Sequence, residues 1–248
     1  MSAMAGFFRF PHTPHLAWLG SGPVRDDKVF TTAEAGAFLA RPVTIEEKLD
    51  GANIGLSLGL DGDLRIQQRG EYLQAPFQGQ FARLGAWLGV HASGLRSFLE
   101  QPDHDGLILF GEWCAARHSV AYTHLPDPFL LFDIVEPTAA SEAGRFWSRR
   151  RRDGAAAQLG LATVPLLQSE AMHTLDALRQ ELEQFRSAYH PGPPEGLILR
   201  QDEDPWCRAR AKLVRADFTQ AIADHWRSRP IEWNGIDYTT VVPEGSAR

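Results

Sequence analysis

The stretch Glu46-Glu47-Lys48-Leu49-Asp50-Gly51-Ala52-Asn53 decides how this chain is interpreted, because a lysine stands where a predicted strand meets a charged turn. Residues 43–48 predict a short strand that ends at Lys48, and a second strand starts at Asn53. Side chains alternate along extended backbone, so Lys48 and Asp50 are expected on the same side of the chain. A lysine beside carboxylates and an amide is a candidate covalent nucleophile. A surface hairpin with a solvated lysine would carry the same letters, so the neighbouring segments must decide.

Patterns on either side of this stretch predict a mixture of strands and helices. Further strands are predicted at 53–60, 64–69, 106–113, 129–135, 196–200 and 207–215, with Asp61-Gly62 as a hairpin turn. Helices are predicted at 76–90, from a cap at Ser141 towards Gly160, from a cap at Thr174, and at 217–226. Strands and helices do not alternate regularly, and no Gly-rich phosphate loop precedes a helix. We therefore expect an α+β fold of mainly antiparallel sheets flanked by helices.

The composition is that of a globular protein. The 248 residues are 44% apolar and carry a formal charge of −6. No apolar run approaches the ~18 residues of a membrane helix, and residues 1–20 lack the unbroken apolar stretch of a signal peptide. Cys114 and Cys207 are too few for a disulfide framework or a four-cysteine zinc site. We expect a cytoplasmic protein that does not associate with membranes.

The basic residues are unevenly divided, with 22 arginines against three lysines, Lys28, Lys48 and Lys212. Arginine stays protonated near neutral pH, whereas a lysine can be tuned into a nucleophile. The lysines are therefore the first candidates for a reactive amine, although a general preference for arginine would give the same count.

Six short motifs, taken in order, resemble those of the covalent nucleotidyltransferases, the superfamily of DNA ligases, RNA ligases and mRNA capping enzymes. Lys48-Leu49-Asp50-Gly51 resembles motif I. The likenesses to motifs Ia, III, IIIa, IV and V lie in Gln68-Arg69-Gly70, Phe110-Gly111-Glu112-Trp113, Phe132-Asp133-Ile134-Val135, Glu195-Gly196-Leu197-Ile198-Leu199-Arg200 and Arg210-Ala211-Lys212-Leu213-Val214-Arg215. Two of the three lysines fall where the superfamily needs one.

Within the superfamily the chain is most similar to phage-type RNA ligases, because of Asn53 after motif I and the Gly-Glu-Trp form of motif III. Residues 10–16 are also similar to the start of small RNA ligase-like proteins. The resemblance implies a nucleotidyltransferase (ATP-grasp-like) domain over residues 1–226, followed by a C-terminal tail at 227–248 with no room for an additional domain. It also implies ATP as the nucleotide donor and Mg²⁺ or Mn²⁺ as the metal.

The resemblance implies that Lys48 takes AMP from ATP as a lysyl-AMP adduct, passes it to a 5′-phosphate end, and loses it when a 3′-hydroxyl attacks that end. A free lysine is protonated at neutral pH. The charges of Lys212, Arg210 and a divalent metal are therefore expected to lower its pKa and to neutralise the triphosphate. Glu195 is expected to act with the metal, since Mg²⁺ and Mn²⁺ prefer carboxylate and phosphate oxygens.

The same resemblance assigns the nucleotide contacts. Glu112 is expected to accept hydrogen bonds from the ribose hydroxyls, and Phe132 to stack on adenine. Glu47 would meet the adenine edge, and Arg69 would hold the AMP phosphate or the incoming 5′-phosphate. Asn53 would orient the 3′-hydroxyl end or the phosphate. Phe132 as ordinary core and Arg69 as an ordinary surface residue are the alternatives.

The chain departs from phage-type RNA ligases in two ways that affect the expected joining of RNA strands. Arg210 stands where phage-type RNA ligases usually have a lysine, and only 33 residues follow motif V. Strand joining is therefore expected to be weak, restricted in substrate, or dependent on a protein partner that supplies end recognition. Arg145, Trp147 and the run Arg149-Arg150-Arg151-Arg152 form a basic stretch that is predicted to contact the RNA backbone, with a solvated helix face as the alternative. A second basic surface is expected at Arg208, Arg215, Trp226 and Arg227.

Together these observations predict an ATP-dependent RNA ligase that joins RNA 5′-phosphate and 3′-hydroxyl ends. Two alternatives stay open: a minimal ATP-dependent DNA ligase that acts on nicks, and a non-sealing module that holds RNA ends. The intact lysine and the carboxylates of Glu112 and Glu195 disfavour the second.

Overall fold

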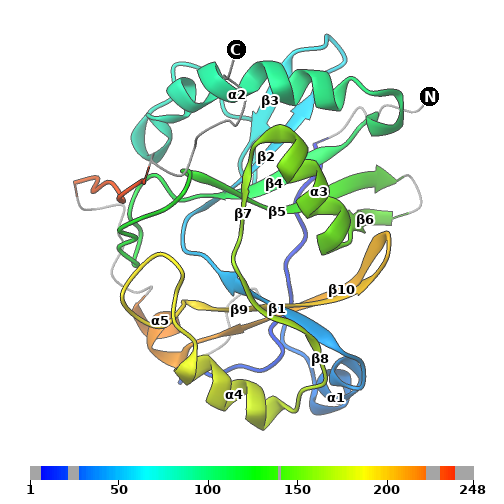
Figure 1. Cartoon of the computed structure of the whole chain (residues 1–248), viewed down its shortest axis with the longest axis vertical. Helices are drawn as coiled ribbons and strands as arrows, with labels where there is room; N and C mark the ends of the chain where they lie inside the picture. Colours follow the sequence, from blue (N-terminus) through cyan, green and yellow to red (C-terminus); the bar gives the residue numbers. More distant parts are fainter. Residues whose placement is uncertain (1–6, 22–27, 139–140, 222–229, 238–248) are drawn as a thin grey trace, which may run out of the picture.

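One ten-stranded sheet organises residues 7–21, 28–138, 141–221 and 230–237, which are the residues that the computed structural model describes (Figure 1). Its strands follow the order β3-β2-β4-β5-β6-β10-β9-β1-β8, and β7 pairs with β5. Only the β5–β7 pair is parallel among these strands. The strands are β1 (Val43–Lys48), β2 (Ala52–Leu58), β3 (Leu64–Gln67), β4 (Ile108–Trp113), β5 (Phe129–Thr138), β6 (Ser141–Trp147), β7 (Ala162–Thr163), β8 (Leu166–Ala171), β9 (Gly196–Glu203) and β10 (Trp206–Val214). The predicted α+β fold with a mainly antiparallel sheet is confirmed.

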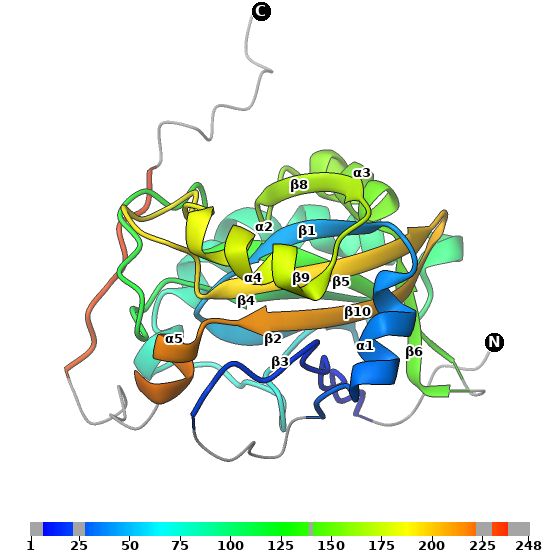
Figure 2. The same ribbon diagram turned by 90° about the horizontal axis from the view of Figure 1, so that it is seen from below.

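Helices lie at opposite ends of the sheet (Figure 1, Figure 2). The helices α2 (Leu84–Leu99) and α3 (Arg149–Leu159) lie beside β2, β4 and β5, whereas α1 (Thr32–Leu39) and α4 (Leu175–Gln184) lie beside β1, β9 and β10. The short α5 (Ala216–Ala221) follows β10, and the 3₁₀ turns Gly79–Phe81 and Pro102–His104 flank α2. Caps at Thr31, Ser148 and Thr174 fix where α1, α3 and α4 begin.

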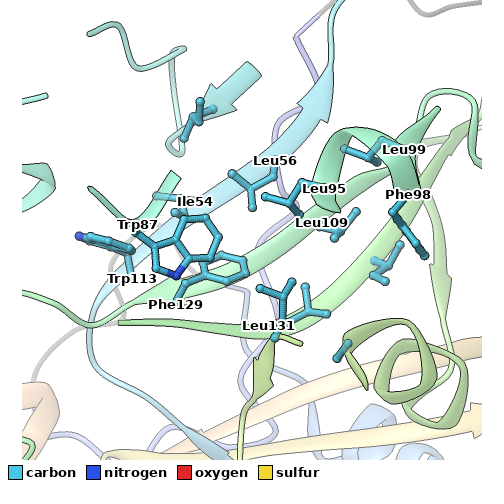
Figure 3. Close-up of a cluster of buried hydrophobic side chains, with 14 of the residues drawn as sticks. Ile54, Leu56, Trp87, Leu95, Phe98, Leu99, Leu109, Trp113, Phe129 and Leu131 are labelled. Carbon is cyan, nitrogen blue, oxygen red and sulfur yellow. The ribbon is translucent and has the colours of Figure 1, made fainter. Parts of the chain in front are cut away.

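Each half of the sheet has its own hydrophobic core. The first core packs α2 and α3 against β2, β4 and β5, with Trp87, Trp113 and Phe129 at one end of it (Figure 3). The second packs α1 and α4 against β1, β9 and β10, with Ile45 and Leu199 fully buried. The strands β6 and β10 join the two halves through only two paired positions. A narrow join of this kind leaves room between the halves for a ligand.

Most predicted elements are confirmed, but two helices differ in their starts. The helix predicted from Ser141 begins only at Arg149, after the Ser148 cap, because residues 141–147 form strand β6 against β5. Pairing with a neighbouring strand outweighs local helix propensity there. The helix predicted at 76–90 begins at Leu84 instead, because Gly79 has a φ of +60°, which a right-handed helix does not allow. Of the helix predicted at 217–226, the part to residue 221 is confirmed, and the rest lies outside the described residues.

The segment 230–237 lies within the range 227–248 that was expected as a C-terminal tail. Trp233 forms a bridge with Ala116, and Ile236 forms one with Leu125, so this segment packs on the loop that follows β4. In the part of the chain described above, no helix combines the length and apolar character of a membrane span.

Candidate active site

Lys48 ends β1 and meets a carboxylate from the neighbouring strand. Its register partner is Gly196, the first residue of β9. The preceding residue, Glu195, places Oε1 2.6 Å from Lys48 Nζ. A Cβ at Gly196 would lie 2.5 Å from the Leu213 carbonyl oxygen, so the close approach of β9 and β10 at this point requires glycine. Gly196 of motif IV thus permits β9 and β10 to lie close together, and the adjacent residue Glu195 contacts Lys48.

The turn after Lys48 is fixed by hydrogen bonds to two other segments. The Gly51 amide donates to Glu112 Oε1 at 3.0 Å. The Asp50 carboxylate accepts from the backbone amides of Ser119 and Val120 at 2.7 and 2.8 Å. Gly51 is itself confined, because an added Cβ would lie 2.6 Å from the Trp113 carbonyl oxygen. These contacts bring motifs I and III together, as their resemblance implied.

A cavity of about 420 Å³ opens between the two halves of the sheet, within the range of small-molecule sites. All the predicted nucleotide contacts line it, namely Glu47, Lys48, Asn53, Arg69, Glu112, Phe132, Arg210 and Lys212. They come from β1, β2, β4, β5, β10 and the segment after β3, so the topology collects residues that are up to 165 positions apart.

The carboxylates around Lys48 shift its pKa in the direction opposite to the one expected. Burial lowers the pKa of Lys48, but the carboxylates of Glu195, Glu112 and Asp50 outweigh burial and raise it above its ordinary value. The expected lowering of this pKa is therefore wrong for the protein alone, because carboxylates rather than cations lie nearest to the amine. Burial in turn raises the pKa of Glu112 to about 7 and that of Glu195 to about 8. The site is thus rich in acid groups and attracts cations.

Buried oxygen atoms without hydrogen-bond partners mark where a ligand fits. Among the described residues these include Glu195 Oε2, Glu47 Oε1 and Asn53 Oδ1. The other oxygen of Glu47 accepts from the Ala188 amide at 2.9 Å. Buried polar atoms are normally satisfied, so these oxygens suit the donor groups of a nucleotide or a metal ion. No cluster of three or more His, Cys, Asp or Glu in that part of the chain forms a complete metal cage. A cation at Glu195 would therefore also need phosphate oxygens, as Mg²⁺ commonly does.

At the other side of the cavity, Arg210 is held by a buried partner. Arg210 pairs with Asp133 and lies with its guanidinium carbon 3.7 Å from the Phe146 ring centroid. Phe132 is half-buried, and its ring meets the edge of Phe10 at a centroid distance of 5.4 Å. Phe132 is thus part core and part cavity wall.

The arginine run does not form the continuous RNA surface that was predicted. Arg152 is buried, with 1% of its surface exposed, and binds Glu46 at 2.7 Å. Arg149 pairs with Asp153 at 2.5 Å, and Arg150 is exposed and pairs with Asp204. Helical periodicity turns one of four consecutive residues towards the sheet, so the assignment of Arg152 to RNA is wrong. Trp147 is also buried and cannot serve as a stacking platform.

Some cavity residues were not assigned from the sequence. Glu46, Asp133 and Arg200 line the cavity and are buried, and residues 10–13 close one side of it. Arg200 donates to Asp133 at 2.6 Å, so these residues form a charged network beneath the cavity. A polar residue inside an apolar strand was the available signal, because burial of a charge requires a partner.

Comparison with known families gives a match that covers the site. A model of the RNA ligase family matches residues 41–214, from β1 to the end of β10. No curated protein sequence matches this chain.

Solved structures share the fold. A Naegleria gruberi RNA ligase variant with ATP and Mn has 17% identity and a TM-score of 0.55, and the match covers 76% of this chain and 54% of that one. The same ligase with PPi has 19% identity and a TM-score of 0.55, with 75% and 52% covered. A variant with AMP and Mn has 16% identity and a TM-score of 0.56, with 89% and 65% covered. In each case the chain spans less than two thirds of the length of the ligase it matches.

Proposed function

The chain belongs to the RNA ligase family, and from that premise we propose that it joins RNA 5′-phosphate and 3′-hydroxyl ends with ATP and Mg²⁺ or Mn²⁺. The observation that carries the proposal is Lys48 Nζ at 2.6 Å from Glu195, beside a nucleotide-sized cavity lined by the motif residues. The Naegleria gruberi RNA ligase of the same fold, solved with ATP, PPi or AMP, supports the choice of donor.

In the first step Lys48 Nζ attacks the α-phosphorus of ATP. A nitrogen–phosphorus bond forms, the bond from this phosphorus to the bridging oxygen breaks, and pyrophosphate leaves. The lysine must first lose a proton, and Glu195 Oε1, 2.6 Å from Nζ, is the nearest acceptor.

The other residues position the nucleotide and offset its charge. Phe132 offers a ring face for adenine, and Glu112 offers a carboxylate oxygen for the ribose hydroxyls. Arg210 and Lys212 approach from β10 and would neutralise phosphate oxygens. The unpartnered oxygen of Glu195 would bind the metal, which when bound polarises the phosphate and offsets the developing charge.

The later steps use the same cavity. AMP passes from Lys48 to a 5′-phosphate, with the nitrogen–phosphorus bond broken and a phosphoanhydride formed. A 3′-hydroxyl then attacks that phosphate, and AMP leaves. Arg69 is exposed at the cavity and is proposed to hold the incoming 5′-phosphate, with Asn53 orienting the reacting ends. We include a protein partner for end recognition in this proposal.

The first test is formation of the AMP adduct. Incubation with ATP and Mg²⁺ or Mn²⁺ should raise the intact mass of the protein by one AMP group, and the adduct should be acid-labile. The Lys48→Ala variant should lose the adduct completely, because it removes the amine proposed to form the bond to phosphorus. Lys28→Ala is the matched control, since Lys28 is exposed and pairs with Glu34 away from the cavity. An adduct that survives Lys48→Ala would refute the assignment.

A second assay decides the strand class. Sealing of nicked RNA, nicked DNA and hybrid duplexes should favour RNA ends. A clear preference for all-DNA nicks would make the protein a DNA ligase, and adduct formation without sealing of any strand would contradict strand joining by this protein alone.

A further inference from the structure

A second groove adjoins the nucleotide cavity. It has a volume of about 330 Å³ and lies between the segment 11–14, strand β6 and strand β10. Pro11, His12, Thr13 and Arg210 line both spaces, so the two are neighbours across the segment 11–13. The family resemblance assigned no function to this groove. Arg145 and Arg208, which the sequence predicted to contact RNA, line it, and Arg151 of the run on α3 reaches its Trp206.

The groove is basic in an acidic protein. Its lining includes Arg145, Arg208 and Arg210 but no Asp or Glu, although the chain carries a formal charge of −6. Arg145 and Arg208 are exposed. Arg208 pairs with Glu203 at 2.9 Å, but both side chains are more than half exposed, so this pair is weak and can yield to another anion. Charge in this groove therefore favours a negatively charged ligand.

The groove also carries an aromatic platform. The guanidinium carbon of Arg145 lies 3.5 Å from the centroid of the half-buried Trp206 ring, and that of Arg151 lies 5.0 Å from it. A guanidinium that stacks through its face keeps its edge N–H groups for bidentate contact with phosphate. Stacked rings and guanidinium planes interleaved along a basic groove are the features that bind single-stranded nucleic acid.

We propose that this groove holds the polynucleotide strand whose end enters the nucleotide cavity, with phosphates on Arg145 and Arg208 and a base on the Trp206–Arg145 stack. The inference rests on the proposed function and adds to it the track by which RNA reaches Lys48. The nucleotide cavity has a volume of about 420 Å³, which is within the range of a small-molecule site, and the neighbouring groove is available for the second substrate. The segment 11–13 then lies between the two substrates.

The test compares RNA binding with adduct formation. The double variant Arg145→Ala/Arg208→Ala should bind a 5′-phosphorylated single-stranded RNA at least about tenfold more weakly and lower the slope of log affinity against log salt by about 1–2. It should still form the AMP adduct, which needs only the nucleotide cavity. Arg179→Ala is the matched control, because Arg179 is an exposed arginine paired with Asp176 on α4. This control should leave RNA affinity and salt slope unchanged.

Stacking is tested separately with Arg145→Lys, which keeps the charge but loses the planar guanidinium. It should weaken RNA binding by less than Arg145→Ala, with the salt slope kept. Thermal melting of each variant confirms that the fold is intact.

Two results would contradict RNA binding in this groove and leave the proposed function intact. One is unchanged RNA affinity and salt slope in the double variant that still forms the adduct. The other is a raised ATP requirement for adduct formation with unchanged RNA affinity, which would assign the groove to the triphosphate. Failure of the wild-type protein to form any adduct would instead refute the proposed function.

Discussion

The carboxylates of Glu112 and Glu195 around Lys48 suit the proposed chemistry, but their ionisation lowers the stability of the folded protein. Glu112 is partly buried and touches the Gly51 amide, and burial raises its pKa to about 7. A carboxyl group with a raised pKa binds its proton more tightly in the folded protein than in the unfolded chain. The folded state therefore bears a cost at neutral pH that the function requires, as active sites commonly do.

This cost gives a prediction for Glu112→Gln with a definite sign. The ordinary pKa of a glutamate is 4.5, so from about pH 4.5 to 7 the unfolded chain loses a proton that folded Glu112 retains. The stability of the wild type therefore falls as pH rises through this window. Glutamine does not ionise, so the stability of Glu112→Gln does not fall for this reason. The variant should have the higher melting temperature at pH 8 and no such advantage near pH 4, measured by thermal unfolding across pH. Equal advantages at both pH values would show that ionisation of Glu112 does not cause the effect.

Among the elements, the segment 230–237 has the clearest link to the site. Asn234 is buried and donates from Nδ2 to the carbonyl oxygen of Cys114 at 2.8 Å, while its Oδ1 accepts from the Tyr122 amide at 3.0 Å. The Tyr122 hydroxyl in turn accepts from the Asp50 amide at 2.8 Å. The segment therefore supports the loop that holds the turn after Lys48, although it lies beyond the family match that ends at residue 214.

Asn234→Ala should destabilise the fold by about 1–3 kcal/mol, because it leaves buried backbone groups without partners. Urea unfolding measures this change. Gln158→Ala, an exposed change on α3, is the control and should stay within about 0.5 kcal/mol. A cost for Asn234→Ala as small as that of the control would mean that water replaces its hydrogen bonds.

For the whole molecule, buried ion pairs connect the two halves of the sheet. Arg152 on α3 reaches Glu46 on β1, and Arg200 on β9 reaches Asp133 on β5. Arg152 also donates to the Phe132 carbonyl oxygen at 2.7 Å. Because each pair crosses from one core to the other, the network fixes how the halves face each other around the cavity.

Arg152→Ala should therefore cost about 3–5 kcal/mol, since it leaves the carboxylate of Glu46 buried with one partner fewer. Chemical denaturation measures the loss. Arg150→Ala, two residues earlier on the same helix but with a side chain that is 82% exposed, should change the stability little. In a double-mutant cycle, Arg152→Ala and Glu46→Ala together should cost less than the sum of the two. Additive costs would show that the two charges do not interact.

The sequence by itself determined the features that depend on neighbours in the chain. Alternation and turn chemistry located β1 and the Asp61-Gly62 hairpin, and the order of the motifs indicated the family before any contact was known. The sequence did not predict strand β6, because the extended form of residues 141–147 depends on pairing with β5.

Only the tertiary structure decided which groups face each other. It placed Glu195 against Lys48 through the register of β1 and β9, turned Arg152 inward, and brought Asn234 under the loop that supports Asp50. It also reversed the expected pKa shift of Lys48. The physical reason is that the energy of a charge depends on its distance to other charges and on its access to water, and both are fixed by segments that are far apart in the chain.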